Sequence, residues 1–462
     1  MFNATTYTQR RRRLKQQLGS GVVLFLGNDE SPMNYTDNMY PFTQDSSFLY
    51  FWGLDAPGLA AVIDIDEDRD VLIGDDPDVA DIIWTGPQPL LREKADAVGV
   101  STTRPASALA EEVAKAVGQG RKIHFLPQYR AENQIKLEAL LGLRAARVNE
   151  YVSVPLIKAV IAQRSVKTDE EVAEIEAALA VSYEMHTLGM REARPGRYER
   201  EVAGAVEGVA ISGGGRLAFP VIFSKRGEVM HNHHYGNRLE AGDLVVNDSG
   251  ACAPSHYASD ITRTIPVSGT FSERQRAIYQ AVLDAQMAAI EAMAPGVSFK
   301  DIHLLAARSM TSDLKDLGLM KGDVDEAVAA GAHAIFFPHG LGHQMGLDVH
   351  DCEGLGEDYV GYDETVQRSP QFGLCYLRLG KALQPGYVVT VEPGCYFVGP
   401  LLDQWRAEGK FDAFINYDAF DAYRGFGGVR IEDDVLVTDD GYRVLGRSIP
   451  KTIAEVEGTA AR

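Results

Sequence analysis

Gly242-Asp-Leu-Val-Val-Asn-Asp-Ser-Gly250 is an apolar run that ends on an acid, Asp248. A second run follows closely, in Tyr257-Ala-Ser-Asp-Ile-Thr-Arg-Thr-Ile-Pro-Val267, and it carries Asp260 near its start. The apolar and β-branched residues of both runs predict β-strands. A carboxylate embedded in such a strand is costly to bury unless a cation or a hydrogen-bond donor satisfies it. The two runs therefore predict strands that carry acids in need of a partner.

Two further acids stand in the same relation to apolar strands. Glu392 follows Val389-Val-Thr-Val391, and Glu432 follows Ile431. Alternate residues of a strand share a face, which places Arg430 on the same side as Glu432. Any one of the four acids, taken alone, is better explained as a strand-end carboxylate bonded to the backbone or to an arginine. Four together, with histidines nearby, favour a functional site.

The histidines gather beside these acids. Seven of the eleven fall in two windows, His231, His233, His234 and His256 in the first and His339, His343 and His350 in the second. Oxygen ligands with one imidazole suit hard or borderline divalent metals such as Mn²⁺, whereas cysteine-rich sites suit structural Zn²⁺. Carboxylates can bridge two metals about 3.5–4 Å apart, and such a pair activates water and stabilises charge on a carbonyl oxygen. The cluster thus indicates a two-metal hydrolytic site.

Five ordered motifs resemble the metal-ligand motifs of Xaa-Pro aminopeptidases and prolidases. The two runs quoted above are similar to the first two motifs, and the other three are His339-Gly-Leu-Gly-His343 with Leu347-Asp-Val-His-Asp351, Val391-Glu-Pro-Gly394 and Val429-Arg-Ile-Glu-Asp433. Tyr40-Pro-Phe-Thr-Gln-Asp-Ser-Ser-Phe-Leu-Tyr50 and Ile83-Trp-Thr-Gly86 resemble the accessory domain of the aminopeptidase branch. The resemblance implies an α/β (α+β) chain, with an N-terminal α/β accessory domain over residues 1–165 and a catalytic pita-bread domain over residues 166–455.

Carried over residue by residue, the resemblance implies both metal ligands and substrate-side residues. Two divalent metal ions per chain, Mn²⁺ first and Co²⁺ or Zn²⁺ as alternatives, would be held by Asp248, Asp260, His343, Glu392 and Glu432. Glu392 would also relay a proton. His231 and His339 would position the substrate, with His233 or His234 as a fallback for His231. His350 would contact the scissile carbonyl, and Arg430 would lie beside the last ligand.

Two intervals are longer than the family pattern. The spacing between Asp248 and Asp260 has one extra residue, which a longer turn at Ala251–Ser255 would absorb. The segment Gly354–Leu383, rich in Tyr and Gly, would either shape the substrate cleft or form a surface insertion. The segment Gly399–Gly427 leaves the same two alternatives open.

The pattern of predicted elements changes near residue 165. Before it, short apolar runs alternate with helical segments, which is typical of an α/β unit. The strands predicted there are Val22–Leu26, Ser47–Phe51, Ala60–Ile65 and Lys122–Leu126, and the helices are Thr8–Leu18, Ala106–Val117 and Ala131–Leu141. The basic residues at the start of the first helix also allow an organelle transit peptide as an alternative. Beyond residue 165, Thr168-Asp-Glu-Glu171 forms a capping box that opens a long helix. Further helices are predicted to start at Ser272 and Ser298. The strands predicted there are Leu244–Asn247, Ala258–Val267, Tyr387–Val391 and Gly428–Val437.

Charge and composition exclude several kinds of partner. The 45 basic and 65 acidic residues give a net charge of −20, which argues against nucleic acid and anionic membrane surfaces. No apolar run approaches the roughly 20 residues that cross a bilayer. The four cysteines, Cys252, Cys352, Cys375 and Cys395, lack CxxC spacing, so we expect packing roles in a reducing cytoplasm. The resemblance implies a homodimer or homotetramer.

Four functions fit these motifs to different degrees. The prediction is removal of the first residue from peptides with proline at position two. A prolidase that cleaves only Xaa-Pro dipeptides is the alternative within the same chemistry, and the accessory-domain motifs favour the aminopeptidase. An inactive binding protein with a peptidase fold, or a metal-free relative acting on a small amidine such as creatine, is disfavoured because all five ligand positions are intact.

Overall fold

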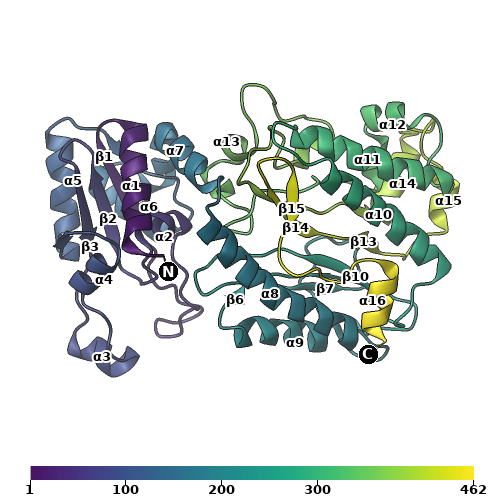
Figure 1. Cartoon of the computed structure of the whole chain (residues 1–462), viewed down its shortest axis with the longest axis horizontal. Coiled ribbons are helices and arrows are strands. Elements are labelled where there is room, and N and C mark those ends of the chain that lie inside the picture. The colour runs from purple at the N-terminus through teal and green to yellow at the C-terminus, as the bar shows by residue number, and fades with distance from the viewer. Residues whose placement is uncertain (1, 462) are drawn as a thin grey trace. The chain divides into compact units, whose positions relative to one another are not determined.

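The computed structural model describes residues 2–461, which form two compact units (Figure 1). Unit 1 comprises the residues up to Arg164 together with Glu353–Tyr359. Unit 2 comprises Ser165–Cys352 and the residues from Val360 onward. The chain therefore passes between the units three times, and the second passage follows His350 by two residues.

Unit 1 is built on a five-stranded mixed sheet of order β4-β3-β2-β1-β5. Its strands are β1 Val22–Leu26, β2 Ala60–Asp64, β3 Arg69–Ile73, β4 Thr102–Arg104 and β5 Ile123–His124. Its helices are α1 Ala4–Leu18, α2 Ser46–Trp52, α3 Val79–Thr85, α4 Leu91–Ala97, α5 Leu109–Gly118, α6 Ala131–Leu141 and α7 Val154–Arg164, with short 3₁₀ turns at Ala106–Ala108, Ala145–Tyr151 and Glu353–Leu355.

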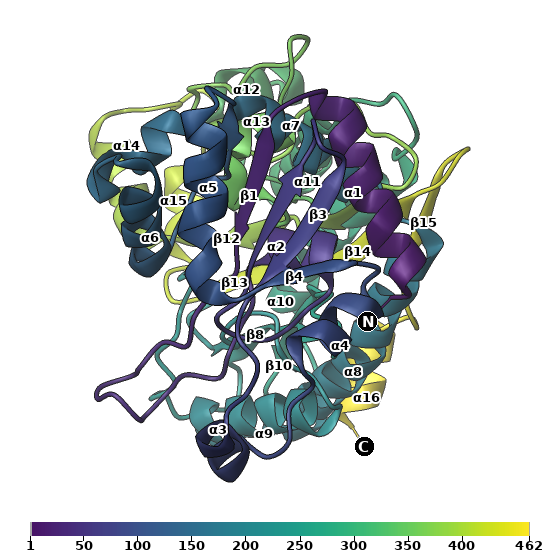
Figure 2. The same cartoon turned by 90° about the vertical axis from the view of Figure 1, so that its left-hand side faces the viewer.

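Helices cover both faces of this sheet. Side chains of successive strand residues point to opposite faces, and β1 is apolar and buried at every position, so both of its faces need cover. Val22, Leu24 and Leu26 pack against α5 and α6, whereas Phe25 packs against Phe51 of α2. Figure 2 shows α5 on one side of the strands and α1 on the other. The basic stretch at the N-terminus forms α1, as predicted, and its Arg11 is fully buried and bonds to Asp70.

Two predicted strands of unit 1 are wrong in type or extent. Ser47–Phe51 is part of helix α2, which Asp45 caps by accepting from the Phe48 N–H. Its residues are buried on every side, so their apolar run carries no period that separates helix from strand. Of Lys122–Leu126, only Ile123–His124 pairs with β1.

Unit 2 surrounds several small sheets with long helices. The helices are α8 Asp169–Glu192, α9 Glu199–Ser212, α10 Glu273–Glu291, α11 Phe299–Asp316, α12 Val324–Ala330, α14 Gly399–Ala407, α15 Tyr417–Asp421 and α16 Ile453–Ala460, while α13 Glu357–Gly361 spans the third passage between units. The strands are β6 Arg216–Leu217, β7 Ile222–Ser224, β8 Leu244–Asp248, β9 Ala251–Cys252, β10 Thr262–Pro266, β11 Val388–Val391, β12 Gly394–Tyr396, β13 Gly428–Arg430, β14 Asp433–Val437 and β15 Tyr442–Val444, with 3₁₀ turns at Ala332–Ile335 and Leu374–Tyr376.

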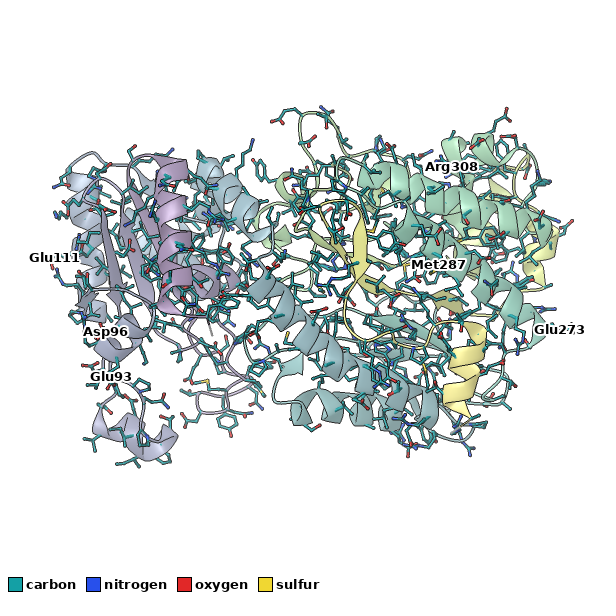
Figure 3. The ribbon with its side chains drawn as sticks, in the orientation of Figure 1. Glu93, Asp96, Glu111, Glu273, Met287 and Arg308 are labelled. Carbon is teal, nitrogen blue, oxygen red and sulfur yellow. The ribbon has the colours of Figure 1, made fainter. Side chains whose placement is uncertain are left out.

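The long helices begin where the sequence predicts. The Thr168 and Ser272 side chains cap α8 and α10, and Glu171 and Gln275 return the bond to each cap residue. The helices pack in pairs, α8 with α9 and α10 with α11 (Figure 1). Polar and flexible side chains such as Glu273, Met287 and Arg308 lie on the outer faces of α10 and α11 (Figure 3). The inner faces therefore remain for the sheets that carry the acids.

Strand pairing sets the positions of the acids. β8 pairs with both β7 and β10, and Asp248 lies opposite Thr262 in the second pairing. The predicted strand Ala258–Val267 is regular only from Thr262 to Pro266. The predicted strand Gly428–Val437 is broken at Ile431 and Glu432, because β13 pairs with β12 while β14 pairs with β11. Glu432 thus lies at the point where the chain changes its pairing partner, in a single bridge to Thr262.

Candidate metal and substrate site

The five predicted ligands come from the ends of four strands and one loop. Asp248 ends β8, Asp260 precedes β10, Glu392 follows β11 and Glu432 lies between β13 and β14. His343 belongs to a loop that runs beside β11, and its N–H donates to the Thr390 hydroxyl at 3.1 Å. The backbone of the sheets therefore fixes where each ligand side chain begins.

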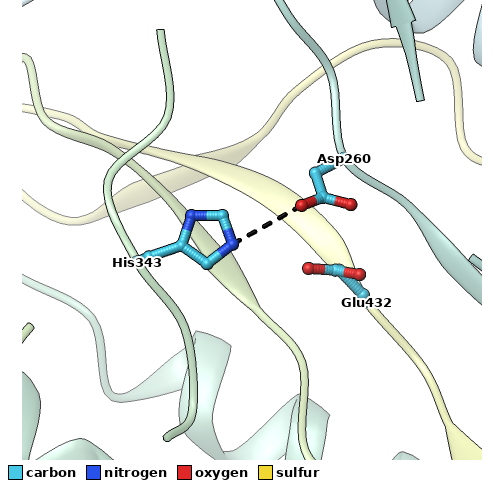
Figure 4. Close-up of side chains that lie close together, drawn as sticks. All are labelled: Asp260, His343 and Glu432. Carbon is cyan, nitrogen blue, oxygen red and sulfur yellow. Dashed lines mark ion pairs between the residues drawn. The ribbon is translucent and has the colours of Figure 1, made fainter. Parts of the chain in front are cut away.

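Three of these side chains form a tight buried cluster (Figure 4). One ligand atom each from Asp260, His343 and Glu432 lies within 4.8 Å of the other two. His343 Nε2 is 3.4 Å from Asp260 Oδ2 and 3.7 Å from Glu392 Oε1. Asp248 and Glu392 line the same cavity, so the structure brings all five predicted ligands together.

The charges of this cluster do not balance without added cations. Arg430 donates from Nη2 to Asp248 Oδ2, and this one cation faces four carboxylates that would carry four negative charges when ionised. Within residues 2–461, Asp248 Oδ1 and Asp260 Oδ1 are buried without a hydrogen-bond partner. A buried carboxylate oxygen without a partner is strongly unfavourable. Carboxylate oxygens with one imidazole are the donor set of a divalent metal site, so these residues fit a divalent metal ion.

Burial and mutual repulsion favour the protonated form of three ligand carboxyls in the metal-free chain, those of Asp260, Glu392 and Glu432. Burial, followed by the neighbouring Asp248, raises the pKa of Asp260 well above its usual range. Burial and then Asp260 raise the pKa of Glu432 in the same way. Burial raises the pKa of Glu392 to about 7, although His343 and Arg430 oppose the shift. Metal ions compete with these protons, since a ligand must lose its proton to bind.

The contribution of Glu392 to the stability of the metal-free chain is expected to fall as pH rises from about 4.5 to about 7. The pKa of Glu392 is raised from 4.5 in its ordinary state to about 7 in the folded chain. The stabilisation is complete below the unfolded pKa and is lost as pH rises through the folded value, because only the folded chain keeps the proton between them. Glu392 contributes at most about 3 kcal/mol, and less because its side chain is 19% exposed. Urea unfolding of the chelated wild type and of chelated Glu392→Gln at about pH 5 and about pH 8 isolates this contribution, because the two chains share the other titrating groups. A wild-type free energy of unfolding that rises relative to that of the variant across this window contradicts the prediction.

Thr262 and Tyr396 connect the ligands to the basic and imidazole groups around them. The Thr262 hydroxyl donates to Glu432 Oε2 at 2.6 Å and accepts from Arg430 Nε at 3.1 Å. The Tyr396 hydroxyl accepts from Arg430 Nη1 at 2.9 Å and lies 2.8 Å from His339 Nε2. Neither residue was a candidate from sequence. Their only sequence signal is their position, two residues after Asp260 for Thr262 and four residues after Glu392 for Tyr396.

The cluster opens into a cavity of about 740 Å³ within unit 2. The predicted substrate-side residues His231, His339, His350 and Arg430 all line it, and so does His233. His234 is exposed and its N–H bonds to Asn232, while His256 Nδ1 lies 2.6 Å from Arg216 Nη2. The structure thus places His231 and His233, rather than His234, at the cavity.

Three cavity histidines, His231, His339 and His350, are neutral near pH 7. Burial lowers the pKa of His339 to about 3, and Arg430 adds to the effect. Burial, followed by the adjacent His343, lowers the pKa of His350 to about 2. Burial and then Arg430 also lower the pKa of His231. Neutral imidazoles carry one donor and one acceptor each, which suits binding to a peptide group.

The long segment before Glu392 contributes to the cavity wall. Phe372, Tyr376 and Arg378 of the segment Gly354–Leu383 line the cavity, as does Leu401 of the segment Gly399–Gly427. Each segment is predicted from sequence either to shape the cleft or to form a surface insertion. The four residues named here line the cavity, which agrees with the first alternative. Arg378 was not a candidate from sequence, because no motif surrounds it.

Two known protein families match most of the chain. Residues 173–439 match the model of metallopeptidase family M24. The chain belongs to this family. Residues 7–124 match the aminopeptidase P N-terminal domain. The predicted family, enzyme class and fold class are therefore confirmed, whereas the boundary at residue 165 and the individual site roles stay predictions.

Relatives and solved structures cover the whole M24 chain. Human Xaa-Pro dipeptidase is 33% identical over 100% of this chain and 92% of its own length. A probable Xaa-Pro aminopeptidase of Aspergillus clavatus is 32% identical over 96% of this chain and 93% of its own. The structure of Pseudomonas aeruginosa aminopeptidase PepP superposes with a TM-score of 0.81 at 27% identity, covering 100% of this chain and 98% of that one. Proline aminopeptidase P II from Yersinia pestis gives 0.82 at 28% identity, with 100% of both chains covered.

Within residues 2–461, no helix is both long and apolar enough to cross a membrane. The cysteines are free, and Cys252, Cys352 and Cys395 are buried. This burial agrees with the predicted packing roles.

Proposed function

We propose that the chain hydrolyses the peptide bond before proline and releases the first residue of peptides with proline at position two. The observation that carries the proposal is the excess of buried carboxylates around His343. This cluster opens into a cavity that is also lined by neutral imidazoles. The relatives and solved structures named above bear the names Xaa-Pro dipeptidase, Xaa-Pro aminopeptidase and aminopeptidase P, which supports the same chemistry.

The five clustered residues would hold two divalent ions, with Mn²⁺ as the first candidate and Co²⁺ or Zn²⁺ as alternatives. The ligands would be Asp248, Asp260, His343, Glu392 and Glu432. When bound, such ions supply an activated water and Lewis acidity toward a carbonyl oxygen. Arg430 donates to one oxygen of Asp248, and the other oxygen has no hydrogen-bond partner in the described chain.

Residues of the chain itself would move the proton and orient the substrate. Glu392 would accept and return a proton, since a carboxylate is a common general acid–base group. His350 would donate to the scissile carbonyl oxygen, because its neutral ring carries one N–H. His231 and His339 would orient the substrate. The Tyr396 hydroxyl bonds to His339 Nε2 and holds the position of that ring. The bond before proline lacks an N–H, so recognition through carbonyl oxygens and shape suits this substrate.

Arg378 favours a second candidate, a prolidase restricted to Xaa-Pro dipeptides. It is a cation of the cavity wall that is not part of the acid cluster. A dipeptide ends in a carboxylate one residue beyond the scissile bond, and arginine pairs with carboxylates through two parallel hydrogen bonds. A longer peptide has an amide at that place and gains less from the guanidinium.

Cleavage of Gly-Pro and of a tripeptide Gly-Pro-Ala by the wild-type chain and by Arg378→Met separates the two candidates. For the aminopeptidase, we expect the wild type to prefer the tripeptide by at least about 10-fold in kcat/KM, and the variant to change this value little. For the prolidase, we expect the dipeptide to be preferred and the variant to raise its KM by about 10- to 100-fold, the value of a charge-assisted pair. Arg308→Met, on the outer face of α11, is the control. Cleavage of neither peptide in the metal-loaded protein contradicts both candidates.

Location in the cytoplasm stays a prediction from the cysteine content, and assembly as a homodimer or homotetramer stays a prediction from the resemblance.

A further inference from the structure

His350 lies on a loop that folds back on itself between His343 and Asp351. Gln344 bridges to Val389 at the start of this loop, and its carbonyl accepts from the Asp351 N–H at 2.9 Å at the end. The closure stacks the His350 ring edge-on against the His343 ring, with centroids 4.2 Å apart. The position of His350 therefore depends on what holds the loop closed.

Asp351 holds the loop through its side chain as well as its backbone. Its Oδ1 accepts from the Asp348 N–H at 3.2 Å, and its Oδ2 accepts from Lys167 Nζ at 3.0 Å. Both charged side chains are almost fully buried, 1% exposed for Lys167 and 2% for Asp351. Breaking such a pair on one side leaves an uncompensated buried charge, which is strongly unfavourable.

The backbone around this pair is tightly packed. A Cβ added to Gly346 would lie 2.7 Å from Asp351 Oδ2 and 3.0 Å from Lys167 Cε, so the loop accepts no side chain there. The Lys167 N–H also donates to the Gly386 carbonyl at 2.8 Å, just before β11. Lys167 is thus anchored at its backbone to the strand that leads to Glu392, and at its ammonium to the loop that carries His350.

We propose that Lys167 and Asp351 are positioning residues that fix His350 at the scissile carbonyl. The proposal rests on the proposed function, because it uses the role of His350 in contacting that carbonyl. Asp351 adjoins His350 in the chain, so a shift of its carboxylate by loss of Lys167 moves the neighbouring imidazole. A displacement of about 1 Å at a reacting centre can lower the rate by about 100-fold.

Lys167→Met and His350→Ala, singly and combined, test the proposal with the metal-loaded chain. Met replaces Lys with a side chain of similar length and no charge. We expect Lys167→Met to lower kcat by about 10- to 100-fold with KM within about threefold, and to leave the metal content unchanged. In the His350→Ala background, we expect the same change to lower kcat by less than about threefold further, because the group being positioned is already gone. Multiplying effects of the two changes overturn the proposal.

The double variant Lys167→Met with Asp351→Asn separates positioning from general stabilisation. It removes both charges and keeps an acceptor for the Asp348 N–H, so thermal stability should recover toward wild type. We expect kcat to stay low; a kcat that recovers together with Tm overturns the proposal. Arg11→Met removes an equally buried cation in unit 1 and is the control, with a lower Tm and an unchanged kcat expected.

Two further outcomes are distinguishable. If Lys167→Met does not fold, Lys167→Arg takes its place, because it keeps the charge but replaces the compact ammonium by a planar group. A lowered kcat of Lys167→Arg at the wild-type Tm supports the proposal. An unchanged kcat overturns it. If His350→Ala alone leaves kcat unchanged, the role of His350 in the proposed function is wrong, and the positioning proposal falls with it.

Discussion

Asp260→Asn is expected to abolish peptide hydrolysis, with kcat/KM lowered by about 10³-fold or more. The Asp260 carboxylate lies within 4.8 Å of ligand atoms of His343 and Glu432, and its Oδ1 has no protein partner within the described chain. The amide is similar in shape but replaces one anionic oxygen with an NH₂ group. We therefore expect purified Asp260→Asn to hold at least one metal ion fewer per chain, as measured by elemental analysis alongside the cleavage rate.

Asp64→Asn is the matched control for this experiment. Asp64 is also a buried aspartate, but it pairs with Arg121 in unit 1. Its replacement should lower stability while metal content and activity stay near wild type. Chelation of the wild-type protein should reproduce the loss of activity reversibly, and restoration by Mn²⁺, Co²⁺ or Zn²⁺ ranks the candidate metals. A metal-replete Asp260→Asn chain with full activity rules out Asp260 as a ligand.

Glu392→Gln is expected to lower kcat by about 10²- to 10⁴-fold, the range of general acid–base catalysis. Glutamine keeps the size of the side chain and one oxygen, but it cannot take up a proton from water and return it. Stopped assays of kcat and KM with a saturating Xaa-Pro peptide measure the effect, which should fall mainly on kcat.

Glu228→Gln serves as the control, because Glu228 lines the same cavity but bonds to Arg226 outside the acid cluster. A Glu392→Gln rate close to that of this control would show that the proton moves through another group. A loss of both metals in Glu392→Gln would instead assign Glu392 a purely ligating role.

The four acids of the site could be picked out from sequence because each adjoins an apolar run, whereas their roles as ligands, and that of His343, come from the family resemblance and stay predictions. Pairing of β8 with β10 brings Asp248 and Asp260 together, but Glu392 follows β11, which belongs to a different sheet. Glu432 also adjoins an apolar run, although the strand around it is broken where the chain changes its pairing partner. That break could not be predicted, since both halves have the same apolar alternation.

Residues that act across loops could not be found in this way. Arg378 reaches the cavity from a non-helical stretch just after the 3₁₀ turn Leu374–Tyr376, and its neighbours in sequence give no sign of the cavity it lines. Lys167 and Asp351 are 184 positions apart, and nothing local marks either as a buried charge. The mistaken strand at Ser47–Phe51 has a related cause, because a run buried on every side has lost the polar face that gives the period.

The N-terminal unit is discontinuous in the chain, since it includes Glu353–Tyr359 as well as the residues up to Arg164. The unit therefore cannot be exchanged between related proteins as one continuous segment. A swap of the first 164 residues alone would leave that short stretch among unfamiliar neighbours, immediately downstream of His350 and Asp351. We therefore expect a working chimera to need the exchange of residues 353–359 together with the residues up to Arg164.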